Sequence, residues 1–389
     1  MKKIKSLEGL RGIAAFVVVL YHFLGQYYPS LVNGTPNQIM TYSGVELKIA
    51  TTPFNVLYNG DYAVYIFFVL SGFVLSYKFY QTGDPKAITS SAFKRYFRLV
   101  IPVIFSVMCF YVLYTLQLPY GPKNKIADFG LFDAIYEGLF GVFFREGSSS
   151  YNPVLWTMYF EFFGSFLVFG LCLIVVKNRN RFWIYLLFIF ILWNSNFLAF
   201  LIGMMICDYK SSGLNIHNKF LKLGLLLVAL FLGSYPHAIG RLEGAVTINE
   251  TMYSFLYFGD SSGRFYHTIG AGLLLLVLIN SKTLDKFLSI KPFQFLGFIS
   301  FSMYVIHFAV LKFFTFFVYH SVGEVFPILT HKYKFFVSFS ASIIIILIVS
   351  YLMAKYIDMG GVKLANKIYN KFFADLKVKT KVDQQNLNT

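Results

Sequence analysis

Charged residues are scarce in this chain of 389 residues: Asp, Glu, Lys and Arg make up 13% of it, whereas 57% of the residues are hydrophobic and 20% are aromatic. Soluble domains carry about 25% charged residues, so this composition excludes a chain built only of soluble domains. Apolar runs of about 18 residues or more, long enough to cross a bilayer as a helix, recur from end to end. We therefore predict an all-α, polytopic protein embedded in the lipid bilayer.

Cysteines are few, and none is placed for redox or metal chemistry. Cys109, Cys172 and Cys207 each lie inside an apolar run, without a CxxC pair and without histidines at the spacing of metal ligands. We expect them to be packing residues and expect no bound metal. Residues 1–24 have the basic and apolar parts of a signal peptide but lack a small-x-small cleavage motif, so we predict a retained first helix.

About ten apolar segments are predicted to be transmembrane helices. They are 9–28, 61–80, 98–117, 154–176, 182–194, 197–208, 220–236, 265–281, 297–318 and 335–357. The fifth and sixth are short and share one tight turn, so we expect them to be tilted or to span only partly. Residues 1–357 would form the membrane domain, and 358–389 a basic cytoplasmic tail that we expect to be partly disordered on the inner leaflet.

The net charge of +16 is explained by membrane topology. Lys and Arg gather on alternate connections, which the positive-inside rule assigns to the cytoplasm, so both termini are predicted to be cytoplasmic. Because the basic residues do not line one surface, we expect no nucleic-acid partner. The long opposite connections, 29–60, 118–153 and 237–264, are where a polar acceptor would be met, and 131–144 is predicted to be an amphipathic or re-entrant segment.

Four ionisable residues lie within predicted spans, where insertion of such a side chain costs about 2.5 to 3.5 kcal/mol. They are His22, Glu161, His307 and Lys312. His22 follows Arg11 by eleven residues, so the two share a helix face, about 16 Å apart, and would line one wall of a channel. The alternative is a snorkelling arginine and a core histidine hydrogen-bonded to a neighbouring helix.

Glu161 lies seven residues into its predicted helix, at about the depth of His22 and His307. Three titratable groups at one level favour an acid/base site. A proton relay or cation site in a transporter, and inert packing of the histidines, are the alternatives that the residues leave open.

Arg95 and Arg98 form an RxxR motif at the predicted cytoplasmic start of the third helix, next to Lys94. Guanidinium groups bind phosphates through parallel hydrogen bonds, and the pyrophosphate and 3′-phosphate of CoA would meet this face. Two ordinary positive-inside residues are the alternative. In the second helix Ser71 and Gly72 interrupt a run of large residues. Small residues let another helix approach closely, which is the interpretation we favour; the alternative is close approach of a ligand.

Five patches resemble acyltransferase family 3, the membrane O-acyltransferases that modify polysaccharides, lipopolysaccharide and other glycoconjugates. They are LEGLRGIAAFVVVLYH (7–22) with its Arg-x10-His spacing, IFFVLSGFVLSY (66–77), KRYFRLVIP (94–102), LWTMYFEFF (155–163) and FISFSMYVIHF (298–308). Their order is that of the family. Two features depart from it: Tyr65 stands where many members have Asp, and the hydrolase-like domain of larger members is missing, so we expect a stand-alone enzyme.

The resemblance implies ten helices with both ends in the cytoplasm, Arg11, Arg95 and Arg98 on the donor side, and His22 as the essential residue of the reaction centre. It implies acyl-CoA, usually acetyl-CoA, as the donor co-substrate. The acceptor would be a hydroxyl of a cell-surface carbohydrate or glycolipid, and the location the plasma (inner) membrane.

In the predicted mechanism acyl-CoA binds from the cytoplasm at these arginines and Lys94, and His22 is the general base on the acceptor hydroxyl. Glu161 orients or charges the imidazole, and His307 completes the pocket or donates to the oxyanion; an acyl-histidine intermediate is a variant. The expected pocket residues are Ser71, Gly72, Trp156, Ser302 and Tyr304. A secondary transporter coupled through His22, Glu161 and Lys312, and a non-catalytic binder of CoA or lipid, are the alternatives from other classes.

Overall fold

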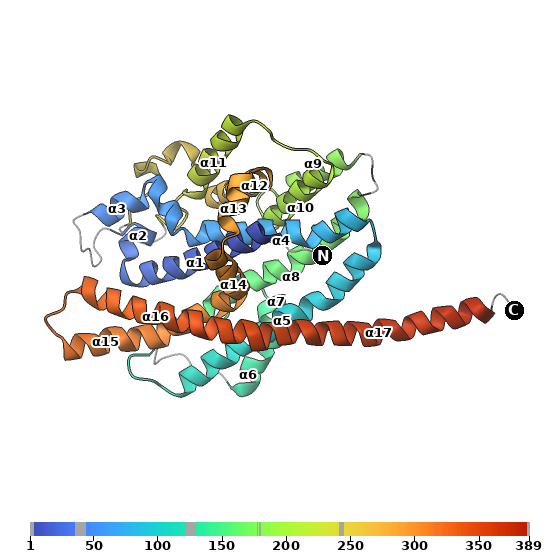
Figure 1. Ribbon diagram of the computed structural model, residues 1–389. Coiled ribbons are helices and arrows are strands. Elements are labelled where there is room, and N and C mark those ends of the chain that lie inside the picture. The colour runs from blue at the N-terminus through green and yellow to red at the C-terminus, as the bar shows by residue number, and fades with distance from the viewer. Residues whose placement is uncertain are drawn as a thin grey trace.

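The computed structural model describes residues 4–35, 44–121, 130–176, 178, 180–240 and 245–386, with side chains up to residue 373. Within these residues every regular element is a helix, as predicted (Figure 1). Seven helical segments of this described part are long and apolar enough to cross a membrane. The chain is therefore an all-α, multi-pass membrane protein.

Each predicted helix has a helical counterpart. In chain order these are α1 (Lys5–Tyr27), α4 (Gly60–Thr82), α5 (Pro85–Thr115), α8 (Thr157–Val175), α9 (Arg181–Leu192), α10 (Phe197–Ser211), α11 (Lys219–Gly233), α12 (Ser262–Asn280), α14 (Lys291–Ala309) continued by η6 (Val310–Thr315) and α15 (Phe316–Val325), and α16 (His331–Met353). Helices α9, α10 and α11 have 12, 15 and 15 residues, which is too short for a hydrocarbon core of about 30 Å without tilt or thinning. Ten crossings, and the cytoplasmic side for both termini, stay predictions.

Helix α5 begins at Pro85, well before the predicted start at Arg98. Asp84 caps this start by accepting a hydrogen bond of 2.9 Å from the backbone NH of Lys86, and proline is favoured in a first turn. The hydropathy pattern did not predict this start because the first turns of α5 contain many polar residues. Arg95 and Arg98 consequently lie about three turns inside the helix and not at its start.

Another helix packs against α5 through Phe93. Helix α17 (Met359–Asn386) continues α16 through the π-helical segment η7 (Ala354–Asp358) and projects from the bundle in Figure 1. The ring centroid of Phe93 in α5 lies 5.8 Å from those of Tyr369 and Phe373 in α17. This contact joins the C-terminal helix to the end of the bundle where α4 leads into α5.

The connection between α5 and α8 turns back along α5. It contains α6 (Leu131–Tyr136), η2 (Glu137–Gly141), α7 (Val142–Phe144) and η3 (Pro153–Trp156). The Tyr96 hydroxyl donates to the Leu139 carbonyl at 2.7 Å, and Asn152 Nδ2 lies 2.9 Å from Ser106 Oγ. Tyr96 lies about five turns before the end of α5, and Ser106 about two and a half turns before it. The Tyr96–Leu139 contact therefore favours the re-entrant alternative for residues 131–144.

Glycines set the closest helix contacts. In α4, a Cβ atom on Gly72 would lie 2.0 Å from the Phe200 carbonyl oxygen of α10, and one on Gly203 would lie 2.0 Å from the Val69 oxygen. Only glycine allows backbones to approach this closely. Gly72 therefore has the packing role that the sequence favoured.

Helices α1 and α14 meet in the same way. A Cβ atom on Gly12 would lie 2.4 Å from the backbone nitrogen of Gly297, and one on Gly297 would lie 2.3 Å from the Glu8 carbonyl oxygen. This contact fixes the lateral position of the two helices that carry the histidines. The remaining described elements are α2 (Pro29–Asn33), α3 (Val45–Ala50), η1 (Pro53–Leu57), η4 (Ile248–Glu250), η5 (Ser254–Leu256) and α13 (Lys282–Leu288).

Candidate active site

His22 of α1 and His307 of α14 face each other. The Nε2 atom of His307 lies 3.1 Å from Nδ1 of His22, and the ring centroids are 5.1 Å apart. His307 is fully buried, whereas His22 is half-buried. The fold thus brings together two of the predicted titratable residues that are 285 positions apart in the sequence.

Backbone carbonyls assign the protons of both rings. His307 Nδ1 lies 3.1 Å from the Met303 oxygen and 2.8 Å from the Tyr304 oxygen, so Nδ1 carries the proton and Nε2 of the neutral ring is an acceptor. His22 Nδ1 lies 3.0 Å from the Val18 oxygen and beside that acceptor, so it also carries its proton. The neutral His22 ring therefore has its lone pair on Nε2, where a general base needs it.

Three guanidinium groups gather from α1 and α5. Arg95 interacts electrostatically with Arg98 and Arg11, and Arg98 interacts with Arg11 and with the carboxylates of Glu8 and Asp358. Arg11 and Glu8 form an ion pair of 3.0 Å. The predicted donor-side arginines are thus neighbours in space, although 84 residues separate Arg11 from Arg95 in the sequence.

Glu161 is bonded to this arginine cluster. Arg95 forms an ion pair with its carboxylate, and Ser71 Oγ donates to the two carboxylate oxygens at 2.9 and 3.0 Å. The bonds of the His22 ring go instead to Val18 and His307. The structure thus brings Glu161 to Arg95 and Ser71, and not to the imidazole of His22 that it is predicted to orient.

Three further predicted residues lie in packing contacts. The Lys94 ammonium lies 4.4 Å from the Tyr369 ring centroid, which directs it toward α17. Gly72 lies in the α4–α10 contact described above. The Trp156 ring packs edge-on against Phe68, with centroids 6.4 Å apart.

The two predicted hydroxyl groups of α14 have different surroundings. Tyr304 donates its proton to the Val154 carbonyl, and its oxygen lies 2.9 Å from Thr157 Oγ1. With that proton already committed, Tyr304 is poorly suited to bind an oxyanion. Ser302 Oγ is buried and has no hydrogen-bond partner among the residues that the structure describes.

Two residues near His22 were missed from the sequence, Tyr21 and Asp61. The rings of Tyr21 and His22 meet edge to face at 5.5 Å, the Tyr21 hydroxyl lies 3.4 Å from Asp61 Oδ2, and Asp61 interacts electrostatically with His22. Asp61 was overlooked because an acidic residue in the first turn of a helix is ordinary. Tyr65, which replaces the family's Asp one turn later, was the available signal.

Lys312 is a second charged group near His22. It lies in the π-helical segment η6, its ammonium donates to Gln26 Oε1 at 2.7 Å, and it lies 5.4 Å from the Phe308 ring centroid. Short π-helical segments are frequent at functional sites. In the described part of the chain no group of three or more His, Cys, Asp or Glu residues could hold a metal ion.

Two comparisons with known proteins found a match. A family model described as an acyltransferase domain matches residues 4–355. O-acetyltransferase PaAT-1 from Phomopsis amygdali is 26% identical over an alignment that covers 94% of this chain and 84% of that protein. No solved structure matches.

Proposed function

We propose, from the premise that this chain belongs to the acyltransferase-domain family, that it transfers an acyl group from cytoplasmic acyl-CoA to a hydroxyl of a cell-surface carbohydrate or glycolipid. The family resemblance is confirmed by a match over nearly the whole chain, and the protein is accordingly an O-acyltransferase of the membrane. The relative's name as an O-acetyltransferase supports acetyl as the group and acetyl-CoA as the donor co-substrate. The proposed location is the plasma (inner) membrane, where a cytoplasmic donor and an external acceptor meet.

The observation that carries this proposal is the pair of contacts at Nδ1 of His22, with the Val18 carbonyl oxygen at 3.0 Å and His307 Nε2 at 3.1 Å. From these contacts we assign the proton to Nδ1, which leaves the lone pair on Nε2 to accept a proton. His307 keeps the ring oriented and, through its Nε2 atom, stabilises the imidazolium that forms during the reaction. His307 thus takes the orienting role that the sequence suggested for Glu161.

The arginine cluster is the proposed site of the donor phosphates. Arg98 is exposed, and the Nε atom of Arg95 is buried without a hydrogen-bond partner among the described residues. Arginine forks suit the pyrophosphate and 3′-phosphate of CoA. Since about 16 Å separates Arg11 from His22 along α1, an extended pantetheine arm would be needed to reach the base.

The reaction transfers one proton from the acceptor hydroxyl to the CoA thiolate by way of His22. The acceptor hydroxyl gives its proton to His22 Nε2 while its oxygen attacks the thioester carbon. The C–S bond breaks, and the leaving CoA thiolate takes the proton back from Nε2. In the acyl-histidine variant Nε2 attacks the thioester first, and the acceptor oxygen afterwards displaces the imidazole.

In this scheme Glu161 is a positioning residue of the donor side. It binds Arg95 and is itself held by Ser71. A buried ion pair of this kind fixes the direction of the guanidinium, while Arg11 and Arg98 remain nearby for the phosphates.

Labelled acetyl-CoA tests the proposal directly. Membranes containing the protein and its own cell-envelope glycan should transfer label to the glycan, and His22→Ala should abolish transfer while CoA still binds. The matched control is His217→Ala, at an exposed histidine of the connection between α10 and α11. Equal transfer by wild type and His22→Ala would overturn the mechanism, whereas label on the protein itself would select the acyl-histidine variant.

The same assay separates the two rival functions. A secondary transporter would move a solute without consuming acetyl-CoA, and a non-catalytic binder would retain CoA without releasing labelled product. Family membership over residues 4–355 already favours acyl transfer over both.

A further inference from the structure

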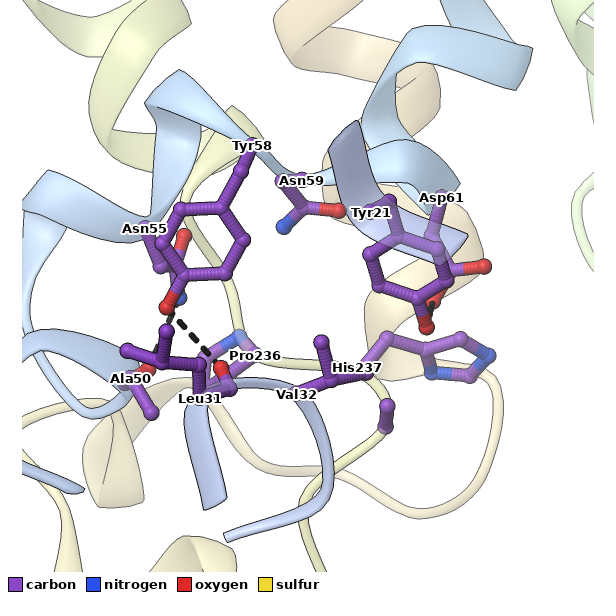
Figure 2. Close-up of a pocket in the computed structure, with 11 residues that line it drawn as sticks. Tyr21, Leu31, Val32, Ala50, Asn55, Tyr58, Asn59, Asp61, Pro236 and His237 are labelled. Carbon is purple, nitrogen blue, oxygen red and sulfur yellow. Dashed lines mark hydrogen bonds between the residues drawn. The ribbon is translucent and has the colours of Figure 1, made fainter. Parts of the chain in front are cut away.

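A pocket opens where α1 and α4 meet the short elements α2, α3 and η1 (Figure 2). Its polar lining is Tyr21, Asn55, Tyr58, Asn59, Asp61 and His237. Tyr21, Asp61 and His237 lie at one end of the pocket and Asn55 and Tyr58 at the other (Figure 2). The empty space is about 260 Å³, including the part that is open to solvent.

Two of these residues build the wall. Asn59 Oδ1 caps α4 by accepting from the Tyr62 amide at 3.0 Å, and Asn59 Nδ2 donates to the Gly233 and Tyr235 carbonyls at 3.1 and 3.3 Å. This amide ties α4 to the end of α11. Its hydrogen-bonding capacity is thereby largely used by the protein itself.

The Tyr58 hydroxyl is committed as well. It donates to the Leu31 carbonyl at 2.9 Å, and burial raises the pKa of Tyr58 above its usual range, so the proton stays on the hydroxyl. The wall around Asn59 and Tyr58 is therefore held by the protein's own hydrogen bonds and exists before a ligand arrives.

Two other groups face the pocket as acceptors. Asn55 is only 4% exposed and donates through Nδ2 to the Ala50 carbonyl at 2.9 Å, while its Oδ1 atom has no donor among the described residues. The half-buried Asp61 carboxylate has the Tyr21 hydroxyl near one oxygen at the long distance of 3.4 Å. A buried acceptor without a donor is costly, so a ligand here should bring hydrogen-bond donors.

The pocket adjoins the reaction centre. Tyr21 lines it and is followed directly by His22, with the two rings in edge-to-face contact. Asp61 lines it and interacts electrostatically with the same imidazole. A group bound at this end of the pocket therefore lies next to the proposed general base.

We infer that this pocket is the acceptor subsite and that it binds one neutral, hydroxyl-rich unit, a monosaccharide residue, through Asp61 and Asn55. The inference rests on the proposed acyl transfer to a hydroxyl. Hydroxyl groups supply the donor that Asn55 Oδ1 lacks and a further donor for the Asp61 carboxylate, whose hydrogen bond from Tyr21 is long. A carboxylate in the wall disfavours a phosphate or an acidic sugar by charge repulsion.

The test compares a neutral and an acidic acceptor. Membranes carrying the full-length chain are assayed for acetyl transfer from labelled acetyl-CoA to methyl glucoside and to methyl glucuronide. Wild type should prefer the glucoside, and Asp61→Asn should lower the ratio of the two kcat/KM values about tenfold or more, because a charge-assisted hydrogen bond and a repulsion disappear together. Any effect of Asp61 on His22 is common to both acceptors and divides out of the ratio.

A second variant guards against a fold defect. Asn55→Leu should lower kcat/KM for the glucoside without improving the glucuronide, and Asp260→Asn, at an exposed aspartate outside the pocket, should leave the ratio unchanged. An unchanged ratio in Asp61→Asn, or unchanged use of the glucoside in Asn55→Leu, overturns the subsite. If the wild type labels the envelope glycan but uses neither glycoside, the assignment of a neutral monosaccharide is overturned and the proposed acyl transfer stands. If the wild type transfers no label to any acceptor, both the subsite and the proposed function are overturned.

Discussion

Replacing His307 by phenylalanine removes one of the two acceptors of His22 Nδ1–H, leaves the Val18 carbonyl as the other, and keeps an aromatic ring in the same buried space. The lost contact is the 3.1 Å hydrogen bond between Nε2 of His307 and Nδ1 of His22. In the transition state the His22 ring becomes a cation, and hydrogen bonds to charged groups are worth about 1.5 to 3 kcal/mol. We expect kcat to fall about 10- to 150-fold. KM for acyl-CoA should stay unchanged, since the arginine cluster lies about 16 Å from His22 along α1.

The assay is steady-state release of CoA in four proteins: wild type, His307→Phe, His22→Ala and the double variant. If the two histidines act as a unit, the double variant will be no slower than His22→Ala alone. The matched control is His267→Phe, at a fully buried histidine of α12 whose Nε2 bonds the Tyr235 carbonyl at 2.9 Å. Its effect should multiply with that of His22→Ala. Multiplying losses for His307→Phe, or a change confined to KM, would refute the pairing.

Three further predictions concern the donor side and the helix contacts. Arg98→Lys should weaken CoA binding by roughly 1 to 3 kcal/mol but leave pantetheine binding unchanged in calorimetry, because Lys keeps the charge and loses the fork; equal losses for both ligands would assign Arg98 to the fold. Glu161→Gln should lower the free energy of unfolding by about 3 kcal/mol, because Arg95 keeps its charge and loses its carboxylate partner. The same substitution should raise KM for acyl-CoA more than it lowers kcat. Unchanged thermal unfolding together with a loss of kcat alone would contradict this. Gly203→Ala should destabilise by about 1 to 3 kcal/mol, since its Cβ would lie 2.0 Å from a backbone oxygen of α4, whereas Gly170→Ala, with nothing within 4 Å, should be tolerated in the same unfolding experiment.

The helices themselves were largely predictable from local sequence. Hydropathy identified all the long spans because lipid selects for apolar side chains over about 20 successive residues. The exception is the start of α5, whose first turns contain exposed polar residues such as Lys86 and Thr89 and therefore give no hydropathy signal. The Arg11–His22 spacing and the RxxR motif likewise pointed to a donor side and a reaction centre, since helix geometry alone sets which residues of one helix share a face.

The local sequence is therefore sufficient to identify the side chains that each helix contributes: His22, His307, Glu161 and the arginines. Contacts between them depend on how the helices pack. Glycine contacts between α1 and α14 bring His22 to His307, whereas the packing of α8 against α5 brings Glu161 to Arg95. The sequence did not identify Asp61 as a site residue, and only the fold shows that it lies beside Tyr21. Helical periodicity determines which residues share a face of a helix, whereas the partner and depth of each face depend on close packing between helices that are distant in the sequence.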